Sequence, residues 1–107
     1  MAPHHHSVYV VELDPSVRDD RRFAAVNPAC SPDLPCVYVG LTGLNPEERF
    51  ARHKAGVQNS RIVKRYGLRL LPAMYEHLNP MPYEAAAQME TDVADDLRDE
   101  GYGVWQY

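Results

Sequence analysis

The stretch from Cys36 to His53, CVYVGLTGLNPEERFARH, constrains the fold more than any other part of the chain. Its first residues are rich in β-branched and aromatic side chains, which is typical of a strand. After a Thr-Gly turn, Asn45, Pro46 and Glu48 occupy the cap, first and third positions of a helix start. The stretch therefore predicts a rigid strand–turn–helix unit that carries three chemically useful side chains: Tyr38, Arg49 and His53.

Two further strands are predicted on either side of this unit. Residues 7–13, SVYVVEL, have strand composition, and so do residues 68–77, where Pro72 cannot donate to a ladder and implies an edge or bulged strand. Residues 14–35 contain four prolines and separate two strands that would otherwise form a hairpin. We expect this stretch to be an insertion, with a short helix capped by Asp14 at its start.

Two further helices complete the predicted order. Residues 61–66 form a short helix capped by Asn59 or Ser60, and the last helix runs from Pro82 to about Glu100. The order strand, insertion, strand, helix, helix, strand, helix predicts a single α+β domain over residues 1–107, with a small three-stranded, mostly antiparallel sheet flanked by helices. Residues 1–6 are expected to form a disordered tail.

Cellular context follows from what the sequence contains. The N-terminus lacks a basic segment and a cleavage site, and no apolar run approaches the ~20 residues that span a bilayer, so we expect a cytoplasmic protein without a membrane partner. Cys30 and Cys36 match no zinc pattern and are expected to be free thiols, with a disulfide as the alternative. His4, His5 and His6 are interpreted as part of the tail, with metal binding as the alternative.

Charge is distributed unevenly along a chain whose net charge is −4. Residues 49–69 hold seven of the eleven basic residues and no acid, whereas residues 84–100 hold seven acids and one arginine. A basic region on an acidic protein attracts a polyanion locally, which makes DNA a candidate partner through residues 49–69. The alternative is a pair of solvated helix faces of opposite sign.

Glu90 lies on the wrong face of the last predicted helix. With an advance of about 100° per residue, an apolar stripe runs from Val93 through Ala86 and Leu97 to Ala94, and Glu90 falls within it. Burying an unpaired carboxylate costs several kcal/mol, so Glu90 needs a partner. That partner would be an arginine such as Arg49, a hydroxyl group or a metal ion.

Several of these residues recur in one known arrangement. Tyr9 lies in the first strand, SVYVV, and Tyr38 lies in VYVGLTG. Arg49 and His53 have the spacing R-x-x-x-H, and Glu90 lies on a late helix. From residue 7 to about residue 101, this combination resembles the GIY-YIG nuclease domain, in which two tyrosine-bearing strands lead a compact α/β domain and an arginine and a glutamate complete the site.

The chain also departs from that family. Ser7 and Val8 replace the Gly and Ile of the first motif, and Val39 replaces the Ile of the second. The stretch 14–35 is longer than the usual connection and would be an insertion between the two tyrosine motifs of a stand-alone domain. Family members commonly carry an Asn after the helix with the glutamate, whereas this chain has Gln106 as the only amide there.

The resemblance implies a divalent-metal-dependent endonuclease that hydrolyses DNA phosphodiester bonds with low intrinsic sequence specificity. It assigns one Mg²⁺ or Mn²⁺ ion to Glu90 and the scissile phosphate to Arg49. Tyr9 or Tyr38 would accept the proton from water, and His53 would relay a proton or hold the phosphate. The remaining residues expected to bind substrate are Thr42, Arg52, Arg61, Lys64 and Arg65.

Two other interpretations remain open at this point. The first is a catalytically weak or inactive module of the same fold that binds nucleic acid or protein. The missing Asn and the negative net charge favour this module. The complete set of two tyrosines, an arginine and a glutamate favours the enzyme. The second is an unrelated α+β interaction domain. A small domain without a DNA-reading partner domain also predicts a recruiting protein, while the oligomeric state is left open.

Overall fold

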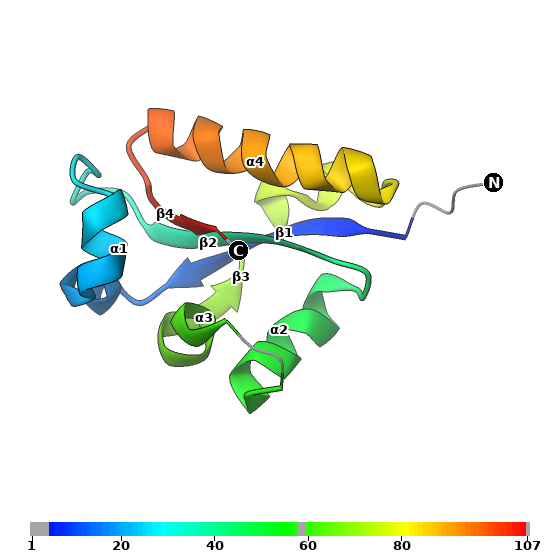
Figure 1. Ribbon diagram of the computed structural model, residues 1–107, viewed down its shortest axis with the longest axis horizontal. Coiled ribbons are helices and arrows are strands. Elements are labelled where there is room, and N and C mark those ends of the chain that lie inside the picture. Colours follow the sequence, from blue (N-terminus) through cyan, green and yellow to red (C-terminus); the bar gives the residue numbers. More distant parts are fainter. Residues whose placement is uncertain (1–4, 58–59, 107) are drawn as a thin grey trace.

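The computed structural model describes residues 5–57 and 60–106 (Figure 1). Residues 1–4 of the expected tail, and Asn59 as a helix cap, lie outside these ranges. The tail is shorter than expected, because His6 forms an isolated antiparallel bridge with Met81. The His6 N–H donates to the Met81 carbonyl at 3.1 Å, and the Met81 N–H donates to the His6 carbonyl at 2.9 Å.

The centre of the fold is an antiparallel pair of strands, β1 (Ser7–Leu13) and β2 (Cys36–Thr42), in continuous register from the pair Ser7 and Thr42 to the pair Leu13 and Cys36. The chain between them is thus an insertion into a hairpin, as predicted. β3 (Gly67–Leu70) pairs antiparallel with the other edge of β1. This third strand is shorter than the predicted 68–77, because Pro72 starts two 3₁₀ turns, η2 (Pro72–Met74) and η3 (Glu76–Leu78).

A fourth strand corrects the predicted number of three strands, while most of the pairings are antiparallel, as predicted. β4 (Gly103–Gln106) pairs in parallel with β2, so the sheet is mixed, with the order β3-β1-β2-β4. The insertion supports this edge. The buried Asn27 amide donates to the Val104 carbonyl at 3.0 Å, and its oxygen accepts from the Val104 N–H at 2.8 Å. These contacts replace those of a further strand, so the insertion closes the edge at this point.

The insertion holds two short helical elements, η1 (Pro15–Asp19) and α1 (Arg21–Val26). Asp14 caps the first and Asp20 caps the second with its side chain. Phe23 of α1 is buried, and its ring stacks on that of Trp105 in β4, with centroids 6.4 Å apart. Both cysteines are free thiols, as expected.

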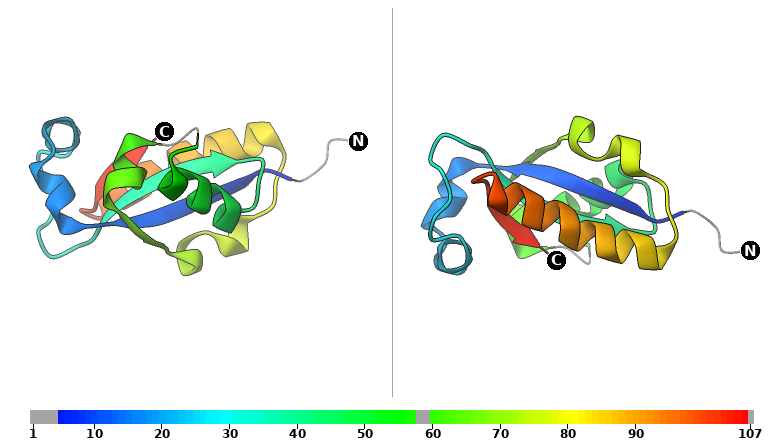
Figure 2. Two further views of the ribbon diagram at one scale, coloured as in Figure 1. Left: turned by 90° about the horizontal axis from the view of Figure 1, so that it is seen from below. Right: turned by 90° about the horizontal axis from the view of Figure 1, so that it is seen from above.

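Helices cover both faces of the sheet. α2 (Pro46–Ala55) and α3 (Arg61–Tyr66) lie on one face, and α4 (Tyr83–Asp99) lies along the other (Figures 1 and 2). The predicted caps are present: the Asn45 side chain accepts from the Glu48 N–H, Ser60 accepts from the Val63 N–H, and Gly56 ends α2 at φ 83°. No helix in the described residues is long and apolar enough to cross a membrane.

Strand alternation decides which side chains meet which helix layer. Successive residues of a strand point to opposite faces. Tyr9 and Tyr38 both point toward α2, where their rings contact His53. Val10 and Val39 point the other way, toward α4, and both are fully buried. The tyrosines and the inner side of α4 are therefore on opposite faces of the sheet.

Candidate active site

The first part of the site is a buried chain of hydrogen bonds from α3 to β1. The backbone N–H of Ser60 donates to Nδ1 of His53 at 2.8 Å, and Nε2 of His53 lies 2.8 Å from the hydroxyl oxygen of Tyr9. A backbone amide only donates, so Nδ1 carries no proton and Nε2 must carry it in the neutral ring. His53 therefore donates its Nε2 proton to the Tyr9 oxygen.

Three aromatic rings are packed together at this point. The ring centroids of Tyr9, Tyr38 and His53 lie 5.7 to 6.1 Å apart, and each side chain is at most 1% exposed. Gly40 lies opposite Tyr9 in the ladder and makes room for the rings. A Cβ atom at Gly40 would lie 2.8 Å from carbon atoms of both tyrosines and from the Tyr9 hydroxyl. The glycine after Tyr38-Val39 is thus a steric requirement of the cluster.

Burial and one cation set the protonation states of the cluster. Burial, with a smaller contribution from the positive charge of Arg49, lowers the pKa of His53 to about 4. His53 is therefore neutral at pH 7. Burial also raises the pKa of Tyr9 far above its ordinary value; Tyr38 raises it further, while Arg49 acts in the opposite direction. His53 and Tyr9 are thus uncharged at neutral pH, with Arg49 as the neighbouring charge.

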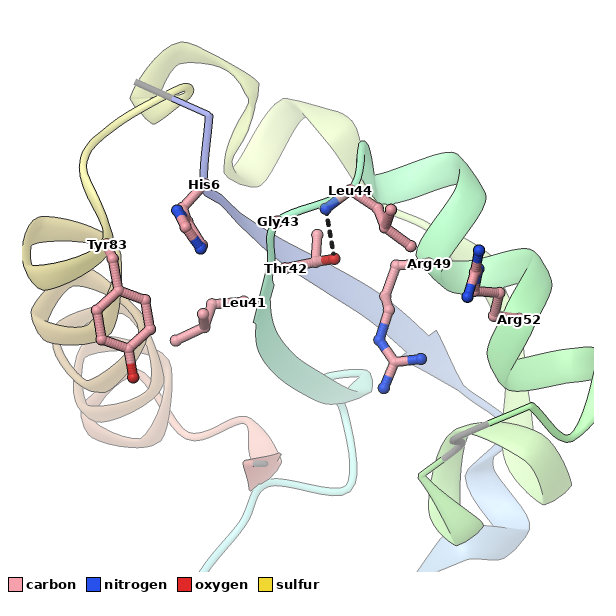
Figure 3. Close-up of a pocket in the computed structure, with 8 residues that line it drawn as sticks. All are labelled: His6, Leu41, Thr42, Gly43, Leu44, Arg49, Arg52 and Tyr83. Atoms are coloured by element: carbon pink, nitrogen blue, oxygen red, sulfur yellow. Dashed lines mark hydrogen bonds between the residues drawn. The ribbon is translucent and has the colours of Figure 1, made fainter. Parts of the chain in front are cut away.

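A cavity of about 500 Å³ opens beside this cluster, and Figure 3 shows the side chains around it. Arg49 and Arg52 of α2 lie on one side, with the turn after β2 between them and the start of α4. Thr42 is buried at the end of β2, and its hydroxyl accepts a hydrogen bond from the Leu44 N–H at 3.0 Å. Two arginines at an open cavity provide guanidinium groups of the kind that bind anions.

Glu90 is buried on α4, as the helical periodicity predicts, and is 6% exposed. Its Oε2 accepts hydrogen bonds from the Gln106 amide at 3.1 Å and, more weakly, from the Thr91 hydroxyl at 3.5 Å. Gln106 also accepts from Arg98 at 2.7 Å, so an arginine–amide pair orients the carboxylate. Burial is the largest influence on Glu90 and raises its pKa. Its side-chain partners are thus Gln106 and, more weakly, the Thr91 hydroxyl, which is one of the partner types that the sequence predicts.

The sheet divides the residues that the sequence placed in one composite pocket. Gln106 is paired with Val39, so Glu90 and Gln106 lie on the α4 face, whereas Tyr9, Tyr38 and His53 lie on the α2 face. The cavity bridges the two faces at the end of β2, because residues of both α2 and α4 line it. Among the described residues, Arg49 faces the cavity most directly from the α2 side (Figure 3).

The other basic residues of the predicted DNA-binding region are spread over the α2–α3 layer. Arg61 forms an ion pair with Asp20 of the insertion at 3.1 Å, which ties α3 to the cap of α1. The Arg65 guanidinium lies 5.4 Å from the centroid of the Tyr66 ring. Arg52 and Lys64 are exposed. Of this group, Arg52 is the residue that lines the cavity.

Two residues of the cavity were missed by sequence reasoning. His6 and Tyr83 line it opposite the arginines (Figure 3). His6 was assigned to the tail, and nothing in the sequence indicates its bridge to Met81. Tyr83 is 54% exposed in the first turn of α4. Because this exposure is a property of the fold, no pattern in the sequence identifies Tyr83 as part of the site.

Glu90 is the one carboxylate that the resemblance assigns to a metal ion. The described residues contain no group of three or more His, Cys, Asp or Glu side chains arranged to hold one. Mg²⁺ commonly keeps several waters and binds through one or two carboxylates together with substrate phosphates. Glu90 alone therefore does not make a metal site, and it would need phosphate oxygens to complete the coordination of an ion. Glu90 is not among the residues that line the cavity beside Arg49.

Comparison of the chain with family models, with curated proteins and with solved structures finds no match.

Proposed function

We propose that this protein is a divalent-metal-dependent endonuclease of GIY-YIG type that hydrolyses DNA phosphodiester bonds with low intrinsic sequence specificity. The observation that carries the proposal is the convergence of Tyr9, Tyr38, His53 and Arg49 from β1, β2 and α2 next to an arginine-lined cavity. This convergence was expected from the resemblance, and the resemblance also supplies the reaction. The two free thiols fit a reducing compartment, and we infer a cytoplasmic location.

Arg49 would bind the scissile phosphate. Its guanidinium stays charged at any working pH and offers a planar fork that suits two phosphate oxygens. His53 donates a hydrogen bond to the Tyr9 oxygen, which leaves the Tyr9 hydroxyl proton available for donation to another acceptor. Such preorganised donors stabilise charge that develops during the reaction. Arg52, Arg61, Lys64 and Arg65 would bind neighbouring backbone phosphates without reading sequence.

The hydrogen-bond network refines the roles of Tyr9 and His53. Because Nδ1 of His53 is occupied by the Ser60 N–H, the ring has no free lone pair with which to accept a proton, so we assign it an orienting role. Tyr9 keeps its proton at neutral pH because its pKa is raised, and it enters the reaction as a hydrogen-bond donor. Thr42 would complete the phosphate side of the cavity.

Glu90 would hold one Mg²⁺ or Mn²⁺ ion together with the substrate. When bound, such an ion supplies positive charge to a phosphoryl oxygen and acidifies a coordinated water. The protein's own contribution is to hold the carboxylate in place, which the Arg98–Gln106–Glu90 chain of hydrogen bonds does. Gln106 thus supplies the amide at the position where the family commonly has an Asn after the same helix.

The second candidate function is a catalytically weak or inactive module of the same fold that binds nucleic acid or a recruiting protein. The raised pKa of Tyr9 and the separation of Glu90 from the tyrosines by the sheet favour this candidate. It predicts binding without hydrolysis.

Nicking of supercoiled plasmid separates the two candidates. We expect the wild-type protein to nick DNA with Mg²⁺ or Mn²⁺ and not with EDTA, and Arg49→Ala to lose at least about 100-fold in rate, as for a lost charge-stabilising donor. Arg21→Ala, an exposed arginine of the insertion, is the matched control and should retain activity. DNA binding by the wild type without metal-dependent nicking would favour the module and overturn the enzyme.

A further inference from the structure

The cavity beside Arg49 has two chemically different sides. The arginines Arg49 and Arg52 form one side, while Tyr83, His6 and Leu41 form the other (Figure 3). The His6 and Tyr83 rings meet edge to face, with centroids 5.2 Å apart and an interplanar angle of 73°. The turn that contains Thr42 lies between the two sides. A ligand that fills this cavity thus meets cations at one end and aromatic and aliphatic groups at the other.

Tyr83 is available to bind a ligand. Its side chain is 54% exposed, the highest value among the large hydrophobic residues that the structure describes as exposed. Tyr83 lies in the first turn of α4 and is not one of the buried residues of that helix, so the packing of α4 does not require its ring. His6 contacts that ring, and the backbone of His6 is fixed by the bridge to Met81. The ring is therefore positioned by contacts on one side and open on another.

A nucleotide has the same division into an anionic phosphate and a flat base. Bases stack on aromatic side chains regardless of sequence, and phosphates pair with guanidinium groups. The cavity volume of about 500 Å³ is within the range of roughly 300–1,000 Å³ that holds small organic ligands. In a duplex, both faces of a base are covered by its neighbours. A base can stack on Tyr83 only when it is unpaired and unstacked.

We propose that this cavity binds an unpaired nucleotide of DNA, with its phosphate against Arg49 and Arg52 and its base on the Tyr83 ring. This inference rests on the proposed nuclease function and names its substrate class: DNA with a single-stranded segment next to the bond that is cut. Tyr83 is then a binding residue that selects DNA structure and leaves base identity unread.

The test compares the dissociation constants of a fluorescent 12-nucleotide single strand and of the same sequence as a blunt duplex, by anisotropy at one fixed salt concentration. One base–aromatic stack is worth about 1–3 kcal/mol, which corresponds to a loss of about 5- to 150-fold. We expect Tyr83→Ala to weaken single-strand binding within that range and duplex binding by less than about twofold. Tyr83→Phe, which keeps the ring, should bind like the wild type, and Val26→Ala is a matched exposed control.

The outcomes separate this inference from the proposed function. Unchanged single-strand binding by Tyr83→Ala would overturn the stacking site, and so would an equal loss for both DNA forms. If either result came with metal-dependent nicking by the wild type, the nuclease function would stand and the substrate inference alone would fall. If the wild type bound neither DNA form and nicked nothing, the proposed function would fail, and the inference with it.

Discussion

The buried neutral His53 makes the stability of this protein depend on pH in a direction that can be worked out. The folded chain holds the pKa of His53 at about 4, below its ordinary value of 6.5. The unfolded chain therefore binds more protons at this residue between pH 4 and 6.5, and folding is opposed as the pH falls through that window. Above pH 6.5, His53 contributes its full stabilisation.

The magnitude follows from the size of the shift. Each pKa unit is worth about 1.4 kcal/mol, so the stability attributable to His53 falls by about 2–3 kcal/mol between pH 7.5 and pH 4.5. Glu90 works in the opposite direction, since its raised pKa favours the folded state at low pH. A comparison with His53→Gln cancels that contribution, because both proteins contain Glu90 and only the wild type titrates at position 53.

The assay is urea unfolding of both proteins at several pH values from 7.5 to 4.5. At pH 7.5, His53→Gln should be less stable by about 1–3 kcal/mol, because the Ser60 N–H or the Tyr9 hydroxyl loses a partner. That difference should fall by about 2–3 kcal/mol by pH 4.5, so that it vanishes or changes sign. Exposed His77→Gln is the control and should run parallel to the wild type. Parallel curves for wild type and His53→Gln would refute the assigned protonation state.

Three other substitutions test the structural basis of the site. Gly40→Ala should destabilise the protein by about 1–3 kcal/mol in urea unfolding, because the new Cβ atom would lie 2.8 Å from both tyrosine side chains. The control Gly43→Ala should change stability little, because the nearest atom to its Cβ would be 3.5 Å away. Equal effects of the two substitutions would contradict the ring packing. Asn27→Ala should lower the free energy of unfolding by about 2–4 kcal/mol and expose the amides of β4 to hydrogen exchange, since the Val104 backbone loses both its partners. Unchanged protection of these amides would contradict an edge supported by Asn27. Glu90→Gln should leave the free energy of unfolding at pH 7 unchanged or raise it by about 1 kcal/mol, because burial disfavours the ionised carboxylate. A large loss of stability would mean that the charge itself stabilises the fold.

Local patterns in the sequence were enough for most elements. Asn45 with Pro46, Ser60 and Gly56 fix the ends of the short helices through contacts within a few residues, so the caps could be predicted. The burial of Glu90 could also be predicted, since helical periodicity is a local property. The paired tyrosine strands followed from composition alone.

Long-range contacts account for what could not be predicted. β4 was left out of the expected sheet because its parallel pairing with β2 and its support from Asn27 join residues far apart in the chain. The burial of His53 depends on Tyr9, 44 positions away, and Phe50 is the one large apolar side chain of α2, so the sequence around His53 does not show that it is buried. The contact between Glu90 and Gln106 could not be predicted either, because it forms only when β4 pairs with the sheet.

The most direct test of the central claim is the first-order rate of plasmid nicking by the wild type and by Glu90→Gln at saturating Mg²⁺ or Mn²⁺. Glu84→Gln, an exposed glutamate on the same helix, is the control. If Glu90 holds the ion, Glu90→Gln should lose at least about 100-fold in rate while remaining folded, and Glu84→Gln should match the wild type. A wild-type rate no higher than the protein-free background, or equal nicking by Glu90→Gln and wild type, would contradict a metal-dependent nuclease centred on Glu90.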